Sequence, residues 1–237
     1  MPPSGLLYPG RDLEAMSFAR NYHEWVLAEI APWLKGKVAE IGAGAGNFSR
    51  LLLGLPTVTS LFAFEPSKNM YALLRDSLAE EPNARTFPVT LDEACAEHRG
   101  EFDAITYINV LEHIEDDAQQ LRFAWDTLKP GGHLLVFVPA LPWLYSDHDR
   151  RIGHYRRYRA APLRELVSAQ GFEIVRQKWF DCAGILPWYV AFVLLKRSVG
   201  TGSVSAYDNL VVPLMRRVEA RFAPPIGKNI LLVARKN

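Results

Sequence analysis

A glycine-rich turn between an apolar run and a helical run is the feature that most constrains this chain. Residues 38–48 read VAEIGAGAGNF, so three glycines follow a short apolar strand and precede an expected helix at 48–53. Glycine permits a tight bend and lets a ligand approach the backbone where a Cβ would block it. This order of strand, glycine turn and helix is typical of the first unit of a nucleotide-binding α/β sheet.

Strands and helices alternate along most of the remaining sequence. We expect strands at 38–41, 61–65, 86–89, 102–109, 134–138, 172–180 and 230–234, and helices at 12–34, 48–53, 68–78, 116–128 and 161–170. The alternation predicts a Rossmann-like α/β fold with a seven-stranded, mostly parallel sheet, helices on both faces and an antiparallel last strand. The 237 residues, 49% of them hydrophobic, suit a single globular domain.

We expect this domain to carry two additions, leading cap helices at about 11–34 and an insertion at about 181–227. The core would comprise about 37–180 and 228–237. The insertion is far longer than an ordinary hairpin loop and is expected to cap the active site. Its apolar stretch Gly184–Leu195 is interrupted by Pro187 and falls short of the roughly 20 residues that cross a bilayer. A membrane span is therefore excluded, and contact with a membrane surface stays open.

Composition narrows the compartment and the partners. A formal net charge of +1 gives no reason to expect a nucleic-acid partner. The two cysteines, Cys95 and Cys182, lie far apart and follow no metal-ligand spacing, so we expect no metal site and no disulfide. The N-terminus shows no secretory signal, which favours a cytoplasmic protein.

The acid at the end of the second expected strand is the next informative residue. Glu65 lies about 20 residues beyond the glycine turn, where an acid accepts hydrogen bonds from ribose hydroxyls. The third glycine, Gly46, comes one residue before the position that a dinucleotide fingerprint requires, which is Asn47. This spacing disfavours a nicotinamide dehydrogenase.

Four segments in order resemble class I S-adenosylmethionine (SAM) dependent methyltransferases over about residues 37–140. Glu40–Gly46 is similar to their motif I, and Phe64–Ser67 is similar to the end of their ribose-binding strand. Val110–Ile114 resembles the segment after their fourth strand, and Leu128–Gly132 resembles the turn before their fifth. The resemblance implies SAM as cofactor. Residues 139–158 look like a bacterial subgroup of small-molecule type, some of whose members are fused or adjacent to glycosyltransferases acting on lipid-linked sugars.

The resemblance also implies the cofactor-binding residues. The turn Gly42–Gly46 would hold the methionine part of SAM and Glu65 the ribose, with adenine contacts near Thr90 and Leu91, or at Asp92. Asn109 stands where many relatives have Asp, so no proton transfer is expected of it. The full expected set is Tyr22, Glu40, Gly42, Ala43, Gly44, Gly46, Asn47, Phe48, Glu65, Pro66, Ser67, Met70, Thr90, Leu91, Asn109, Val110, Leu111 and His113.

His113, His154 and Tyr145 are the candidate catalytic residues. Histidine is the usual proton acceptor near neutral pH, and His113 follows the fourth strand, beside the expected methyl position. The alternative is that His113 is only a wall of the cofactor pocket. His154 and Tyr145 accompany the arginines of residues 150–159, which either are solvated or bind a carboxylate or phosphate of the acceptor.

These features predict a SAM-dependent methyltransferase that acts on a small-molecule or lipid-like acceptor. An amphiphilic acceptor with an anionic group is one option, with Trp188, Tyr189 and Phe192 of the insertion as its apolar wall. A protein methyltransferase and a non-catalytic SAM-binding partner subunit remain as alternatives. The sequence leaves open the acceptor, the atom methylated and the oligomeric state.

Overall fold

A computed structural model describes residues 19–196 and 201–237. Its helices are α2 (Arg20–Ile30), α3 (Asn47–Leu53), α4 (Lys68–Ser77), α5 (Leu91–Ala94), α6 (Asp117–Thr127), α7 (Asp147–Arg151), α8 (Ala160–Ala169), α9 (Ile185–Trp188), α10 (Thr201–Ala206) and α11 (Val212–Arg221). Shorter 3-10 or π segments are η1 (Ala31–Trp33), η2 (Leu111–His113), η3 (Pro142–Leu144), η4 (Tyr189–Leu194) and η5 (Tyr207–Val211). The part of the expected leading helix before Ala19 lies outside the described residues.

The seven strands form one sheet in the order β3-β2-β1-β4-β5-β7-β6. They are β1 (Gly36–Ile41), β2 (Val58–Phe64), β3 (Ala84–Phe87), β4 (Phe102–Ile108), β5 (Leu128–Pro139), β6 (Glu173–Phe180) and β7 (Asn229–Arg235). Neighbours from β3 to β5 are parallel, and β7 runs antiparallel to both β5 and β6. This topology confirms the predicted fold class, including the antiparallel last strand.

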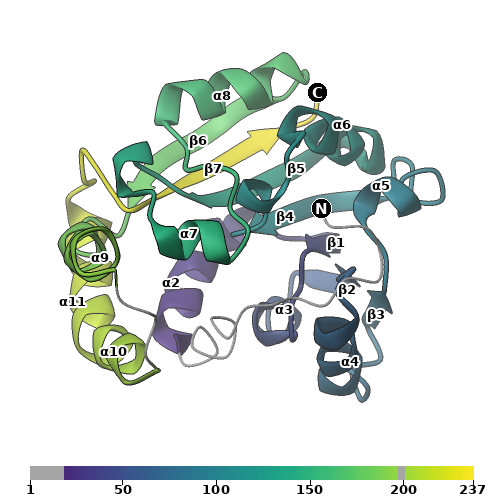
Figure 1. Cartoon of the computed structure of the whole chain (residues 1–237). Coiled ribbons are helices and arrows are strands. Elements are labelled where there is room, and N and C mark those ends of the chain that lie inside the picture. The colour runs from purple at the N-terminus through teal and green to yellow at the C-terminus, as the bar shows by residue number, and fades with distance from the viewer. Residues whose placement is uncertain (1–18, 197–200) are drawn as a thin grey trace.

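Alternate residues of the central strands point to opposite faces of the sheet, and each face carries its own core. Ile41 and Phe64 pack with residues of α5, α6 and α8. Val38 and Leu61 pack on the other face with residues of α2, α3, α4 and α11. The sheet therefore lies between two helical layers (Figure 1).

Strands β1, β2 and β3 begin two or three residues earlier than predicted, and the largest difference is in β5. Strand β5 begins at Leu128, not at Leu134, because Leu128 pairs with Phe102 and the ladder continues through a register shift to the pair Ala104 and His133. The short helices α5 and α7 were not predicted, because four or five residues carry too little periodicity. Each begins with a capping box, on Thr90 and Ser146 respectively.

The insertion is helical and gathers at one end of the molecule, away from α4 and α5 (Figure 1). It comprises α9, η4, α10, η5 and α11. Its two ends meet at the sheet, where the Lys228 amide donates a hydrogen bond to the Asp181 carbonyl at 3.1 Å. No helix in the described residues has the length and apolarity to cross a bilayer.

Gly227, at the end of the insertion, gives a prediction about stability. A Cβ on Gly227 would lie 2.5 Å from the backbone nitrogen and oxygen of Phe180, which are fixed in the sheet. Gly227→Ala is therefore expected to lower the free energy of unfolding by about 1–3 kcal/mol or more, as overpacking does. Urea unfolding measures this. Gly54→Ala is the control, since its Cβ meets only ordinary contacts at 3.4 Å and beyond. Equal effects of the two substitutions would contradict the prediction.

Candidate functional site

A cavity of about 470 Å³ opens beyond the carboxyl ends of β1 and β4. Between these strands the order of the sheet reverses, and such a switch point is where open α/β sheets bind ligands. The glycine turn, the segment after β4, helix α2 and the insertion all contribute to its wall. The lining includes Tyr22, His23, Glu40, Gly42, Ala43, Gly44, Asn47, Phe48, Asn109, Glu112, His113, His148, His154, Arg157, Trp188, Phe192, Tyr207, Lys228 and Asn229.

The glycine turn needs its glycines for conformation and for space. Gly42, Gly44 and Gly46 have φ values of 68°, 56° and 86°, which other residues rarely adopt. A Cβ on Gly42 would also lie 2.7 Å from Cγ2 of Val110. The amide of Gly44 donates a hydrogen bond to Oε2 of Glu65 at 2.9 Å. Glu65 thus holds the turn in a shape that leaves room for a ligand.

Glu40 brings a carboxyl group to the cavity from the end of β1. Its side chain is buried and accepts a hydrogen bond from the Ser49 hydroxyl. Burial raises the pKa of Glu40 to about 8; the Ser49 bond opposes this rise and the charge of Glu65 adds to it. A cationic group beside Glu40 would favour its ionised form. The cavity therefore fits a ligand with a positive charge at this end.

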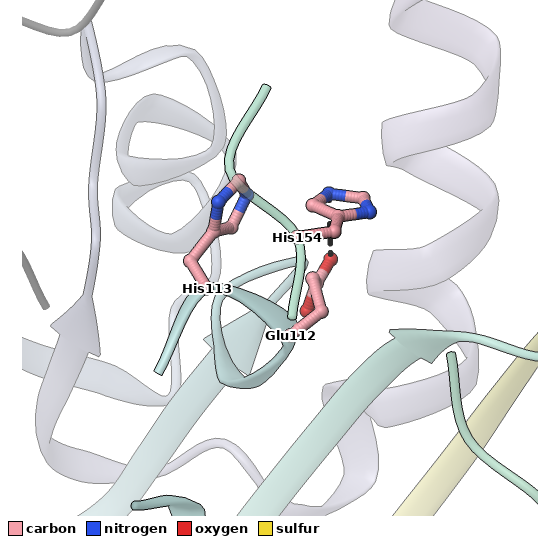
Figure 2. A group of neighbouring side chains, drawn as sticks. All are labelled: Glu112, His113 and His154. Atoms are coloured by element: carbon pink, nitrogen blue, oxygen red, sulfur yellow. Dashed lines mark ion pairs between the residues drawn. The ribbon is translucent and has the colours of Figure 1, made fainter. Parts of the chain in front are cut away.

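Glu112, His113 and His154 form a cluster on the cavity wall (Figure 2). Glu112 and His113 belong to η2, and His154 approaches from the loop after α7. His154 Nε2 lies 3.8 Å from Glu112 Oε1, and the two histidine rings are 4.5 Å apart at 81°. Neither oxygen of the buried Glu112 makes a hydrogen bond. The three ligand atoms lie within 4.8 Å of one another, so this cluster could hold a metal ion.

Burial and charged neighbours set the protonation of this cluster. Burial raises the pKa of Glu112 to about 7 against the opposing charge of His154. Burial, with the charge of His154, lowers the pKa of His113 to about 3, so His113 is uncharged at neutral pH. Burial of Asp149 is outweighed by His154 and Arg157, which hold its pKa at about 2. Ionised Asp149 lies 3.0 Å from Nδ1 of His154 and orients that ring.

The arginines of residues 150–159 differ in burial and in their partners. The Arg157 side chain is buried, pairs with Asp149 at 2.7 Å and lines the cavity. Arg156 pairs with Asp117, and Arg150 with Asp147. Arg150, Arg151 and Arg159 are exposed. Only Arg157 of this group therefore reaches the cavity.

Ten of the predicted site residues line the cavity, and the other ten do not. Those in the lining are Tyr22, Glu40, Gly42, Ala43, Gly44, Asn47, Phe48, Asn109, His113 and His154. Outside the lining lie Gly46, Glu65, Pro66, Ser67, Met70, Thr90, Leu91, Val110, Leu111 and Tyr145. The Tyr145 hydroxyl donates to the carbonyl of His154 at 2.7 Å, which supports the loop that carries His154. The roles of all these residues stay predictions.

The insertion supplies an aromatic wall to the cavity. Phe192 stacks on His148 with ring centroids 4.9 Å apart, and Trp188 lies 4.4 Å from Phe192. Tyr189, which was grouped with them, lies outside the lining and packs against Trp143 instead. Trp188 also donates a hydrogen bond to the Leu144 carbonyl, so it has a structural role besides.

Sequence reasoning did not select several lining residues, notably Glu112, His148, Tyr207, Lys228 and Asn229. Lys228 pairs with Asp181 at 2.9 Å, and its ammonium lies 5.2 Å from the ring of Tyr22. The one available signal was local: Glu112 precedes the selected His113 directly. Lys228 and Asn229 reach the site only because β7 pairs with β5, which no local pattern reveals.

The matching family and the similar curated proteins are methyltransferases. The sequence profile of a family described as "Methyltransferase domain" matches residues 17–177. The chain is 29% identical over 128 residues to a ubiquinone biosynthesis O-methyltransferase of Xanthomonas axonopodis pv. citri, covering 54% of this chain and 52% of that protein. It is 31% identical over 115 residues to the enzyme of the same name from Caulobacter vibrioides, covering 48% and 44%. The chain thus spans about half the length of the curated relatives it matches.

Solved structures share the fold at low sequence identity. The YcgJ protein of Bacillus subtilis superposes with a TM-score of 0.62 at 17% identity, covering 91% of this chain and 99% of that one. A SAM-dependent methyltransferase from Archaeoglobus fulgidus gives a TM-score of 0.62 at 15% identity, covering 95% and 99%.

The ion pair beneath the site gives a second prediction. Asp149 and Arg157 are both buried, whereas Asp147 and Arg150 form an exposed pair on the same helix. Asp149→Asn leaves a buried guanidinium uncompensated and is expected to cost about 3–5 kcal/mol of stability at neutral pH. Asp147→Asn, the matched control, should cost about 1 kcal/mol or less. Urea unfolding of both variants measures the difference, and losses of equal size would refute the assignment of a buried pair.

Proposed function

The chain belongs to the methyltransferase-domain family, and on this basis we propose that it transfers a methyl group from SAM to a hydroxyl group of a small amphiphilic acceptor. The observation that carries the proposal is a single cavity with two different ends. The glycine turn and Glu40 form one end. His154, backed by Asp149, and the aromatic side chains of the insertion form the other.

The first end fits the cofactor by shape and charge. The glycine turn leaves the backbone accessible, and a Cβ at Gly42 would collide with Val110. Glu40, a buried carboxyl group with a raised pKa, would face the ammonium of the methionine part. Glu65 lies outside the lining and holds the amides of Gly44 and Ser67, and its remaining lone pairs would accept bonds from the ribose. When bound, SAM supplies an electrophilic methyl group on a sulfonium.

At the other end, His154 is the proposed proton acceptor. An acceptor hydroxyl must lose its proton as its oxygen becomes methylated, and a positioned histidine is suited to take it. Asp149 lies 3.0 Å from Nδ1 of His154, which leaves Nε2 toward Glu112 and the cavity. His113, with its low pKa, would form the adjoining wall. Relatives named ubiquinone biosynthesis O-methyltransferases support a hydroxyl acceptor.

The aromatic wall supports an acceptor with an apolar part. Trp188 and Phe192 line the cavity, and Lys228 and Arg157 place cations over the ring of Trp188. An amphiphilic small molecule with an anionic or hydroxyl-bearing head fits this lining better than a polar peptide segment does.

Cys95 and Cys182 carry free thiols, which supports the cytoplasmic location expected from the sequence.

Cofactor binding tests the first end of the cavity. S-adenosylhomocysteine should bind, and NAD should not. Because the pKa of Glu40 is about 8 in the free protein, a ligand cation that favours ionised Glu40 releases a proton on binding near pH 7. Affinity should therefore rise as the pH increases from about 6 to about 8.

Isothermal titration calorimetry in two buffers of different ionisation enthalpy measures both quantities. Glu40→Gln is the matched control and should bind without Glu40-linked proton release. Proton release that is unchanged in Glu40→Gln would remove Glu40 from the site. Binding of NAD without binding of S-adenosylhomocysteine would overturn the proposed function.

The aromatic wall gives a kinetic prediction. With labelled SAM and water-soluble alkylated phenols and catechols as acceptors, Phe192→Ala should raise the KM for the acceptor by about tenfold, the loss expected for one buried aromatic contact. The affinity for S-adenosylhomocysteine should stay unchanged. Val190→Ala, on the exposed side of the same segment, is the control. Normal KM in Phe192→Ala would show that the acceptor binds elsewhere.

A further inference from the structure

The outward side of the insertion is unusually apolar. Of the thirteen large hydrophobic residues that are exposed in the described part of the chain, nine lie between residues 185 and 226. The most exposed are Leu210 at 75%, Phe222 at 73% and Leu186 at 68%. Single exposed apolar residues are normal on a protein surface, whereas many of them gathered in one region mark an interaction surface.

These side chains form two stripes with helical spacing. Leu210, Leu214, Val218 and Phe222 follow one another at intervals of four along η5 and α11, and Leu186, Val190 and Leu194 do so along α9 and η4. Residues four apart lie on one side of a helix. The opposite sides are occupied: Val212 packs in the core and Trp188 lines the cavity. We call the two exposed stripes together the outer surface of the insertion.

The charges on this surface have one sign. The acidic residues of segment 181–227 are Asp181, Asp208 and Glu219, and all three are buried. They are held inside by hydrogen bonds, for example from Tyr207 to Asp181 and from the Tyr22 amide to Asp208. The described basic residues of the segment, Lys196, Arg216, Arg217 and Arg221, are exposed. Lys196 lies 4.0 Å from Asp147 of α7, so the positive charge of this surface comes mainly from the three arginines. The outer surface is therefore apolar and cationic.

We propose that the outer surface of the insertion docks on an anionic lipid bilayer. Helices that combine an apolar stripe with basic residues lie in the membrane interface, where the apolar side chains enter the acyl boundary and the basic ones contact lipid phosphates. A second copy of this chain is a poorer occupant, because it would bring a second cationic surface against the first. The contact is peripheral, since no described helix has the character of a membrane span.

The position of this surface links it to the cavity. On α9 and η4, Leu186 and Val190 face outward, whereas Trp188 and Phe192 line the cavity. One short helical segment thus separates the bilayer from the proposed acceptor site. An amphiphilic acceptor would enter the cavity from the membrane, and this consequence rests on the proposed function. The docking itself does not.

Vesicle flotation tests the proposal with the full chain. The probes are vesicles of phosphatidylcholine alone and of equal parts phosphatidylcholine and phosphatidylglycerol. The wild-type protein should float with the anionic vesicles and much less with the neutral ones. Leu214→Ser with Phe222→Ser should weaken partitioning by about tenfold or more, since burial of one large apolar side chain is worth that much. Arg216→Gln with Arg217→Gln and Arg221→Gln should remove the preference for anionic lipid.

The control is Leu73→Ser with Arg75→Gln, which removes an exposed leucine and an exposed arginine from α4, away from the insertion. It should float like the wild type. Failure of the wild type to float, or equal loss in the control, would overturn the proposal. A dimer in size-exclusion chromatography that the Leu214 and Phe222 substitutions abolish, without vesicle binding, would assign the surface to a second copy. All these variants should bind S-adenosylhomocysteine normally, so failure of docking is distinct from failure of the proposed function.

Discussion

The reversal of strand order between β1 and β4 is the constraint on which the site depends. Right-handed crossovers place α3 and α4 on one face of the sheet and α5 and α6 on the other, so the chain leaves β1 and β4 in opposite directions. The chain must therefore bend sharply where β1 ends. Gly42 forms this bend and packs against Val110, which belongs to the segment that follows β4. The glycine turn after β1 and the segment after β4, which both line the cavity, are thus packed against each other.

The antiparallel strand β7 makes the insertion possible. Because Phe180 at the end of β6 pairs with Asn229 at the start of β7, the chain leaves the sheet and returns at the same point. Asp181, in the left-handed conformation with φ of 61°, and Lys228 close this exit with a backbone hydrogen bond and an ion pair. The helices between them can cover the cavity without disturbing the sheet.

The strands and the glycine turn could be predicted because local patterns determine them: apolar runs become buried strands, and the positive φ of Gly42 requires glycine. The contents of the site could be predicted only in part. Five arginines in residues 150–159 look alike in the sequence, and only Arg157 is buried beside the cavity, because Asp149 of α7 holds it there. Likewise Trp188 lines the cavity and its neighbour Tyr189 does not. The rotation of the helix about its axis decides which side chains face the cavity, and the π geometry of η4 changes the angle between successive residues.

The two sides of the α9 and η4 segment differ in the charges that they carry. Inside, the cavity wall carries the buried carboxyl groups of Glu40 and Glu112, together with the cations of Arg157 and Lys228, each of which is paired with an aspartate. Outside, the charges are basic and the surface is apolar. A cationic methyl donor and an anionic membrane would thus each meet the opposite charge. In the proposed reaction, an acceptor between them would place its hydroxyl toward His154 and its apolar part along Trp188 and Phe192.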